Sequence, residues 1–220
     1  MSTGLILLSW VEYGILGLML GLSIWSVAIM IERRQFFLSQ KSSEGSEKIR
    51  EMVLKHEWNG LLQSTGQKNT LLDSSLHLLV SLFQKGEFQS SASMVESLDR
   101  AYRSHINSQK IKMEKGLANL ATLGANAPFI GLFGTVLGII QAFAALGFES
   151  TGTGTVMSGI SRSLIATATG LFVAIPAVIA FNYFSKRLKE IYAETDSLKD
   201  LFISRILTKS ESNSGRGTTK

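Results

Sequence analysis

Hydroxyl side chains recur through a stretch of this sequence that is otherwise apolar. Between residues 156 and 184 they include Ser158, Ser161, Ser163, Thr167 and Thr169. Ser163 and Thr167 are four residues apart, so on a helix they lie on one face, and Gly170 and Ala174 continue the same line. Such a stripe is typical of a path for water or ions, because a hydroxyl donates and accepts hydrogen bonds without carrying a fixed charge.

A structural interpretation of the same hydroxyls is the alternative. Each Ser or Thr of a membrane helix can donate its proton to a backbone carbonyl one turn back in its own helix. The stripe is accompanied by Thr135, the lone hydroxyl of the segment NAPFIGLFGTVLGI (126–139), and this favours the path. A passive membrane scaffold, in which the hydroxyls only pack, remains the competing hypothesis.

Arg162 is the one basic residue within these apolar segments. Its long side chain could reach the outer headgroups, or it could face a lumen and stabilise an ionised carboxylate there. Arginine stays protonated, so it cannot relay a proton by titration. Residues 116–148 and 156–184 contain no acidic residue. A titrating carboxylate in this path must therefore come from a partner, or from Glu12.

Small residues interrupt the same segments. In lipid, they let helix backbones approach closely, and packing then holds the helices together. Proline in such a helix removes a hydrogen bond, which neighbouring helices can compensate. The predicted helix-packing residues are Gly131, Gly134, Gly138, Gly170, Ala174 and Ala177, together with Pro128 and Pro176.

The distribution of charge predicts the elements that carry these residues. Residues 116–185 contain only Glu149 and Arg162 as formal charges, and residues 1–31 contain only Glu12. A helical span needs about 20 mostly apolar residues, so the long block holds two spans and the N-terminal block holds one. The first span is read as a retained anchor, because no basic segment precedes it and no small-residue cleavage site follows it.

Lysine and arginine predict the orientation. Of the 22 such residues, 13 lie between Arg33 and Lys115, eight lie between Lys186 and Lys220, and none lies in residues 1–31. The positive-inside rule therefore predicts an outer N-terminus and a cytoplasmic C-terminus. The net charge of +5 follows from this topology and needs no nucleic acid.

Helical periodicity predicts that the cytoplasmic parts are also α-helical. The stretch from Ser93 through Lys115 lacks Gly and Pro, and one helix is expected to continue from it into the second span. The predicted segments are a periplasmic N-terminus (1–9), a first span (10–31), a cytoplasmic helical segment (32–116), a second span (117–148), a periplasmic loop (149–155), a third span (156–184), a cytoplasmic helical extension (185–208) and a flexible tail (209–220).

An enzyme is not expected. The sequence has no cysteine, its three histidines are scattered, and no catalytic triad, metal cluster or phosphate loop occurs. No cofactor or metal is predicted.

The stretches LATLGANAPFIGLFGTVLGI and GISRSLIATATGLFVAIPAVIAFN closely resemble the proton-channel subunits ExbB and TolQ, relatives of MotA. The likeness covers about residues 120–182. It implies an all-α membrane protein of the bacterial inner membrane with three transmembrane helices, N-out and C-in. The second and third of these helices would extend into a cytoplasmic helical domain, in a homopentameric ring surrounded by membrane lipids.

The resemblance also implies a motor that is driven by proton flow. Five copies would surround two single-span helices of the ExbD/TolR type, whose membrane aspartate picks up and releases protons, and a TonB/TolA-like protein would transmit the force. Thr135 and Thr167 match the pore positions of the family, and Ser163, Thr169 and Arg162 are further candidates for the ion path. The hydroxyls would offer hydrogen bonds to both protonation states of the aspartate.

One departure from the family affects this path. ExbB and TolQ carry a glutamate in the motif GIxEAL, whereas this sequence reads Gly-Ile-Ser-Arg-Ser-Leu and places Arg162 there. A non-conducting relative is therefore an open alternative, as is a stator for gliding or another surface machine. A flagellar MotA is disfavoured, because MotA has four spans and this sequence has three.

Overall fold

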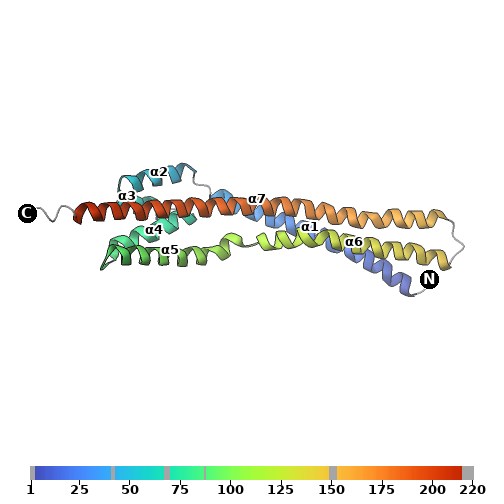
Figure 1. The fold of residues 1–220 in the computed structure, drawn as a ribbon. Coiled ribbons are helices and arrows are strands. Elements are labelled where there is room, and N and C mark those ends of the chain that lie inside the picture. Colours follow the sequence, from blue (N-terminus) through green and yellow to red (C-terminus); the bar gives the residue numbers. More distant parts are fainter. Residues whose placement is uncertain (1–2, 41–42, 67–69, 87, 149–152, 215–220) are drawn as a thin grey trace, which may run out of the picture. The chain divides into compact units, whose positions relative to one another are not determined.

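The computed structural model describes residues 3–40, 43–66, 70–86, 88–148 and 153–214, and Figure 1 shows its helices. They are α1 (Thr3–Ser39), α2 (Ser43–Leu54), α3 (Trp58–Thr65), α4 (Leu71–Lys85), α5 (Ser91–Glu114), α6 (Leu117–Phe148) and α7 (Thr153–Ser214). The described residues contain no strand, so the predicted all-α class is confirmed. Helices α1, α6 and α7 are long and apolar enough to cross a membrane, which matches the three predicted spans.

The chain divides into two compact units. One comprises Met1–Arg34 and Gly116–Ser185 and is called the membrane unit here; the other comprises Gln35–Lys115 and Lys186–Lys220 and is called the extension unit. Each unit combines segments that are far apart in the sequence. Helices α1 and α7 contribute to both units.

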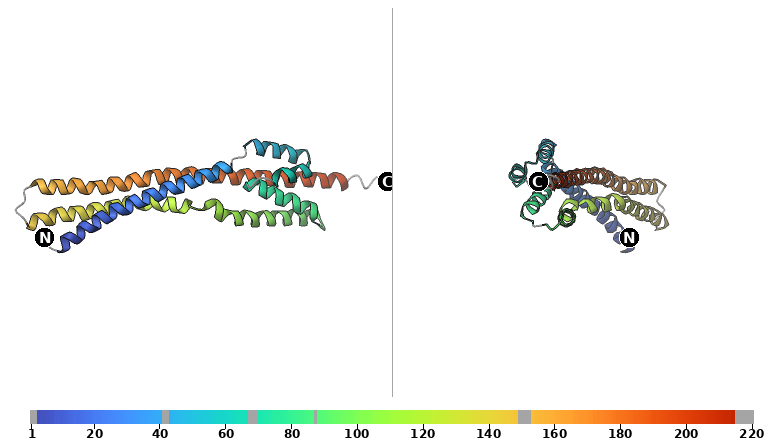
Figure 2. Two further views of the ribbon diagram at one scale, coloured as in Figure 1. Left: turned by 180° about the vertical axis from the view of Figure 1, so that it is seen from behind. Right: turned by 60° about the vertical axis from the view of Figure 1, so that its left-hand side comes forward.

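The membrane unit contains three helical segments. The views in Figures 1 and 2 show α6 running antiparallel beside the first part of α7, with α1 crossing them. Met19 of α1 is fully buried and packs with Ala127 of α6 and with Val173 and Ala174 of α7. The predicted periplasmic loop (149–155) is described only from Thr153, where α7 begins, and residues 149–152 lie outside the described residues.

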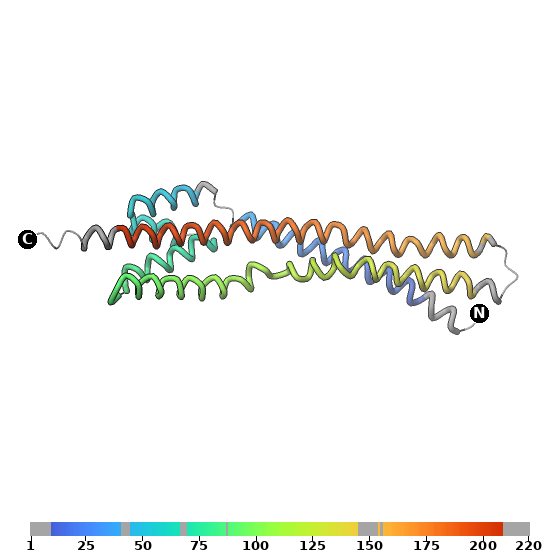
Figure 3. The backbone as a smooth tube through the Cα atoms, viewed as in Figure 1, coloured from blue at the N-terminus to red at the C-terminus, as the bar shows by residue number. Residues whose placement is uncertain are grey.

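The prediction that one helix continues from Ser93 into the second span is wrong at one point. Helix α5 ends at Glu114 and α6 begins at Leu117, as the tube in Figure 3 shows. Gly116 has a φ of +77°, a left-handed conformation that glycine adopts without steric cost. A Cβ there would also lie 3.1 Å from Cγ2 of Ile29. This break coincides with the boundary between the two units.

Helix α7 is continuous over 62 residues. The predicted helical extension beyond the third span is therefore present, and it runs past residue 208 to Ser214. Residues 215–220, the end of the predicted tail, lie outside the described residues. Pro128 and Pro176 are accommodated inside α6 and α7, which continue through them.

The extension unit has a conventional apolar core. Its buried residues come from α2, α3, α4, α5 and the second part of α7, and they include Ile49, Val53, Leu61, Leu72, Leu76, Leu79, Leu98, Leu198, Phe202 and Ile206. Phe202 is fully buried and stacks edge-on against Trp58 and Phe83, with ring centroids 5.3 and 6.1 Å away. The amphipathic periodicity that was read from the sequence thus becomes the core of this unit.

Candidate functional site

The glycines of α6 bring its backbone into direct contact with α7. A Cβ on Gly131 would lie 2.7 Å from the carbonyl oxygen of Ala166 and 3.1 Å from Cα of Gly170. Conversely, a Cβ on Gly170 would lie 2.7 Å from the carbonyl oxygen of Ala127. Real Cβ atoms essentially never lie within 3.0 Å of another heavy atom in this way, so the two 2.7 Å distances to backbone oxygens show that only glycine permits this approach of the two helices.

Two further glycines of α6 continue the same contact. A Cβ on Gly134 would lie 2.8 Å from Cβ of Ala166 and 3.4 Å from Cγ2 of Ile15, so this position meets both α7 and α1. Gly138 lies directly against the side chain of Ser163. The crossing is therefore built mainly from backbone and small side chains, as expected for helices that associate within lipid.

Thr135 and Thr167 lie within this crossing. The Thr167 hydroxyl donates to Oγ1 of Thr135 over 3.4 Å, and the Thr135 hydroxyl donates to the carbonyl of Leu132 over 2.7 Å. Thr135 is buried and Thr167 is half-buried. The structure thus brings together the two threonines that the sequence resemblance predicts for the ion path. Each oxygen retains lone pairs with which to accept a further hydrogen bond.

The other hydroxyl candidates make bonds within their own helix. Ser163 is buried against Gly138 and donates to the carbonyl of Ile160 over 2.8 Å. Thr169 is half-buried and donates to the carbonyl of Ile165 over 2.8 Å. These two bonds are of the kind that the structural interpretation expects.

Arg162 contacts α1 through two adjacent residues. Its Nη2 donates to the hydroxyl of Tyr13, and its Cζ lies 5.0 Å from the centre of the Tyr13 ring. Its Nε lies 3.8 Å from Oε1 of Glu12, a carboxylate whose side chain is 9% exposed, whereas the Arg162 side chain is 53% exposed. The first span therefore supplies both groups that meet the third-span guanidinium.

Sequence reasoning did not anticipate this arrangement. Glu12 was expected only as an acid that could enter the path, and no contact between Arg162 and Tyr13 was predicted. Gln141 of α6 was not considered, yet its buried Nε2 has no hydrogen-bond partner among the described residues. The sequence did contain one indication of these contacts, because every strongly polar group in a charge-poor span needs a partner.

Charged groups in the extension unit join α5 to α7. The Tyr102 hydroxyl donates to Oδ1 of Asp196 over 2.6 Å, and Nζ of Lys199 lies 3.3 Å from Oδ1 of Asp99 and 2.9 Å from Oδ1 of Asp200. Burial, followed by the Asp196 carboxylate, raises the pKa of Tyr102 far above its usual range. Tyr102 therefore remains a neutral hydrogen-bond donor that fixes the two helices.

Asp99 and Lys199 remain ionised. The hydrogen bond from Arg103 is the main cause that holds the pKa of Asp99 below its ordinary value. Burial alone would lower the pKa of Lys199, but hydrogen bonds and charge attraction from Asp200 and Asp99 outweigh it, so the pKa is raised. This network is a structural connection between helices.

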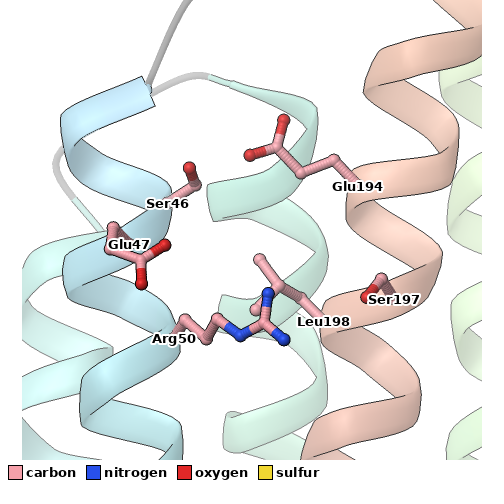
Figure 4. A pocket seen from close by; sticks show the side chains of 6 residues that line it. All are labelled: Ser46, Glu47, Arg50, Glu194, Ser197 and Leu198. Carbon is pink, nitrogen blue, oxygen red and sulfur yellow. The ribbon is translucent and has the colours of Figure 1, made fainter.

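A small pocket of about 230 Å³ lies between α2 and α7 in the same unit (Figure 4). Its lining residues are Ser46, Glu47, Arg50, Glu194, Ser197 and Leu198. Most of these side chains are exposed, and no group of three or more His, Asp or Glu residues able to hold a metal occurs among the described residues. The pocket therefore offers no buried reactive group.

Comparison with known proteins matches residues 68–197 to the MotA/TolQ/ExbB proton channel family. The biopolymer transport protein ExbB of Xanthomonas campestris pv. campestris is 43% identical over 113 residues, which are 51% of this chain and 45% of that protein. The Tol-Pal system protein TolQ of Pseudomonas aeruginosa is 44% identical over 110 residues, which are 50% of this chain and 48% of that protein.

A third relative, the biopolymer transport protein ExbB of Neisseria gonorrhoeae, is 40% identical over 102 residues, which are 46% of each chain. The chain spans about half the length of these relatives. The family match includes Thr135, Thr167 and Arg162, but it begins after Glu12 and Tyr13. With three apolar helices and a family match over more than half of its length, this chain belongs to the MotA/TolQ/ExbB proton channel family and is a multi-pass protein of the bacterial inner membrane.

Proposed function

We propose that this chain is the channel and motor subunit of an ExbB/TolQ-type complex. In that complex it couples the proton-motive force to mechanical work on the cell envelope, either energised outer-membrane transport or envelope maintenance. Relatives named for both systems match at 43% and 44% identity, so the proposal covers both. The observation that carries it is the Thr135–Thr167 hydroxyl pair within the α6–α7 crossing, in the segment that the family match includes.

The proposed partner is an ExbD/TolR-like single-span protein with a membrane aspartate. A threonine hydroxyl can donate to the aspartate when it is ionised and accept from it when it is protonated. A fixed cation at the same place would hold the aspartate in its ionised form by lowering its pKa. The hydroxyl pair therefore suits a group that must gain and lose a proton repeatedly.

The proposed assembly is a homopentamer with an outer N-terminus and a cytoplasmic C-terminus. The membrane unit exposes many large apolar side chains on all three helices, among them Trp25, Phe129, Phe143, Phe172 and Ile179. Such a surface is covered by lipid or by further copies in a membrane. The charge bias of the loops supports the orientation. A TonB/TolA-like protein would receive the force.

The first experiment is native mass spectrometry of the full chain, alone and co-expressed with the single-span product of an adjacent gene. We expect a pentamer that takes up two copies of an aspartate-bearing partner. A monomer or dimer that ignores such a partner would contradict the motor assignment.

The second experiment is proton flux in proteoliposomes that contain the complex. Thr135→Val and Thr167→Val are each expected to lower flux about tenfold or more, because a hydrogen bond to a charged group contributes about 1.5–3 kcal/mol. Thr122→Val is the matched control, since the Thr122 hydroxyl is exposed on α6 and donates to the carbonyl of Ala118.

A membrane scaffold is the second candidate, because the hydroxyls of Thr135, Ser163 and Thr169 all donate to carbonyls of their own helix. The same measurements separate the two functions. A scaffold predicts that both threonine variants assemble and behave like the unmodified protein, whereas a motor predicts normal assembly with lost flux.

A further inference from the structure

Glu12 and Arg162 are the two formal charges within the predicted spans 10–31, 117–148 and 156–184. They come from different helices, α1 and α7, and are 150 residues apart in the sequence. In the structure Oε1 of Glu12 lies 3.8 Å from Nε of Arg162. Tyr13, the next residue of α1, accepts a hydrogen bond from Nη2 of the same guanidinium and places its ring beneath it.

The burial of Glu12 makes this pairing energetically important. The residue is 7% exposed, so its carboxylate has little access to solvent. An ionised side chain within a membrane is costly, and removal of one partner of a buried ion pair leaves the other charge uncompensated. Each of these two residues therefore lowers the cost of placing the other in the bundle.

We infer that Glu12 is the counter-ion of Arg162, and that this pair both fastens α1 to α7 and keeps this level of the bundle electrically neutral. The pairing itself depends only on the membrane unit. Its consequence for ions rests on the proposed function: in a ring, every unpaired Arg162 would add one positive charge near the path, and that charge would oppose the entry of a cation.

Glu12 is thus a positioning residue that acts through Arg162. Its partner Tyr13 holds the guanidinium by one hydrogen bond and by its ring face, an arrangement for which arginine is suited. About half of the Arg162 side chain remains exposed, so this side chain is free to contact a group outside the protomer. The family match begins at residue 68, and so the counter-ion lies outside the segment by which the chain is assigned to its family.

A double-mutant cycle on the full chain in detergent tests the pairing. Glu12→Gln and Arg162→Gln are each expected to lower the Tm by about 5 °C, and the double variant is expected to lower it by clearly less than the sum. Glu51→Gln is the control, because it removes the exposed Glu51–Lys55 ion pair, and such pairs contribute little. Additive losses of Tm would overturn the counter-ion.

Proton flux in proteoliposomes with the partner tests the role of the charge. Glu12→Gln leaves one extra positive charge per protomer, whereas Arg162→Gln leaves one extra negative charge. Both variants lose the connection between α1 and α7, so a purely structural role predicts equal losses of flux. We expect the flux of Glu12→Gln to be about tenfold lower than that of Arg162→Gln, and to recover in the double variant by a similar factor.

Equal flux in the two single variants would overturn the inference that the charge of the pair affects ion entry. The double-mutant cycle in Tm would still decide whether Glu12 and Arg162 are paired. If the unmodified complex carried no flux, the proposed function would fail, and the charge role would fail with it. The Tm cycle would still support or overturn the pairing, so the two failures are distinguishable.

Discussion

The membrane unit and the extension unit are both helical, but they hold their helices together in different ways. In the membrane unit, α6 and α7 meet through Gly131 and Gly170 at backbone distance. In the extension unit, the helices are separated by large side chains, with Phe202 and Trp58 at the centre. Water drives the second kind of packing, because it favours burial of apolar surface, whereas lipid provides no such preference.

The polar groups of the two units also differ, both in their exposure and in their charge. The extension unit has exposed ion pairs one helical turn apart, such as Arg100–Glu96 and Lys55–Glu51, which contribute little individually. Among the described residues of the membrane unit, the Glu12–Arg162 ion pair joins two helices, and its carboxylate is buried. Between α6 and α7, the hydroxyls of Thr135 and Thr167 meet instead of charged groups. A membrane unit built in this way can place polar groups near a path while keeping its net charge close to zero.

The largest expected effect concerns the core of the extension unit. Phe202→Ala should lower the free energy of unfolding of this unit by about 3–5 kcal/mol, because it leaves a cavity beside Trp58 and Phe83. Hydrogen exchange of the full chain, read peptide by peptide by mass spectrometry, is the measurement. Faster exchange in α4 and α5 with unchanged exchange in α6 would show that the units are stabilised separately.

The control for this variant is Ile111→Ala on α5, since the Ile111 side chain is 79% exposed. It is expected to change the free energy of unfolding by less than about 0.5 kcal/mol. If Phe202→Ala accelerated exchange equally in α6, the two units would unfold together and would not be stabilised separately.

A smaller effect with opposite signs is expected for glycine in the two units. Gly131→Ala should destabilise the membrane unit by about 1–3 kcal/mol, because the new Cβ meets the backbone of α7. Gly60→Ala in α3 should instead stabilise the extension unit by about 0.5–1 kcal/mol. A Cβ at Gly60 would have no neighbour closer than 3.9 Å.

The Tm of each variant in detergent shows directly whether the substitution stabilises or destabilises the protein. A neutral or stabilising Gly131→Ala would show that α6 and α7 are held by something other than close backbone approach. A destabilising Gly60→Ala would contradict the expectation that glycine has opposite effects on stability in the two units.

The sequence predicted the elements better than their mutual contacts. The charge-poor blocks identified three apolar helices, and the helical extension predicted over residues 185–208 anticipated the continuation of α7. The break at Gly116 was missed, although a glycine stands there directly after the last charged residue before the second span. A single glycine inside a helical pattern is compatible with either a continuous helix or a break, so only its observed φ decides.

The sequence predicted which candidate residues share a face of one helix better than it predicted which residues of different helices meet. The spacing of Ser163 and Thr167 placed them on one face of α7, and the structure shows Thr167 bonded to Thr135 and Ser163 bonded to its own helix. Which face of α1 meets α7 depends on the rotation of helices that are distant in sequence. That rotation is fixed by packing at positions such as Gly134 against Ile15, and the pairing of Glu12 with Arg162 follows from it.

The smallest expected effect is a pH dependence that is confined to the extension unit. His105 of α5 faces α4, with its Nε2 3.1 Å from the hydroxyl of Ser74. Burial lowers the pKa of its imidazole below the ordinary value of 6.5. The unfolded chain therefore takes up a proton near pH 6.5, whereas the folded chain does so only at lower pH. Stability should fall as the pH drops through 6.5 and level off below the folded pKa.

His105→Gln should remove this slope while its amide keeps a hydrogen bond to Ser74. The expected change is small, about 1–2 °C in Tm between pH 7 and pH 5, because the imidazole is only partly buried. The membrane unit contains no histidine, so exchange in α6, corrected for the intrinsic rate at each pH, is the internal reference. An unchanged slope in His105→Gln would assign the pH dependence to another group. A slope of equal size in α6 would show that pH acts on the two units together.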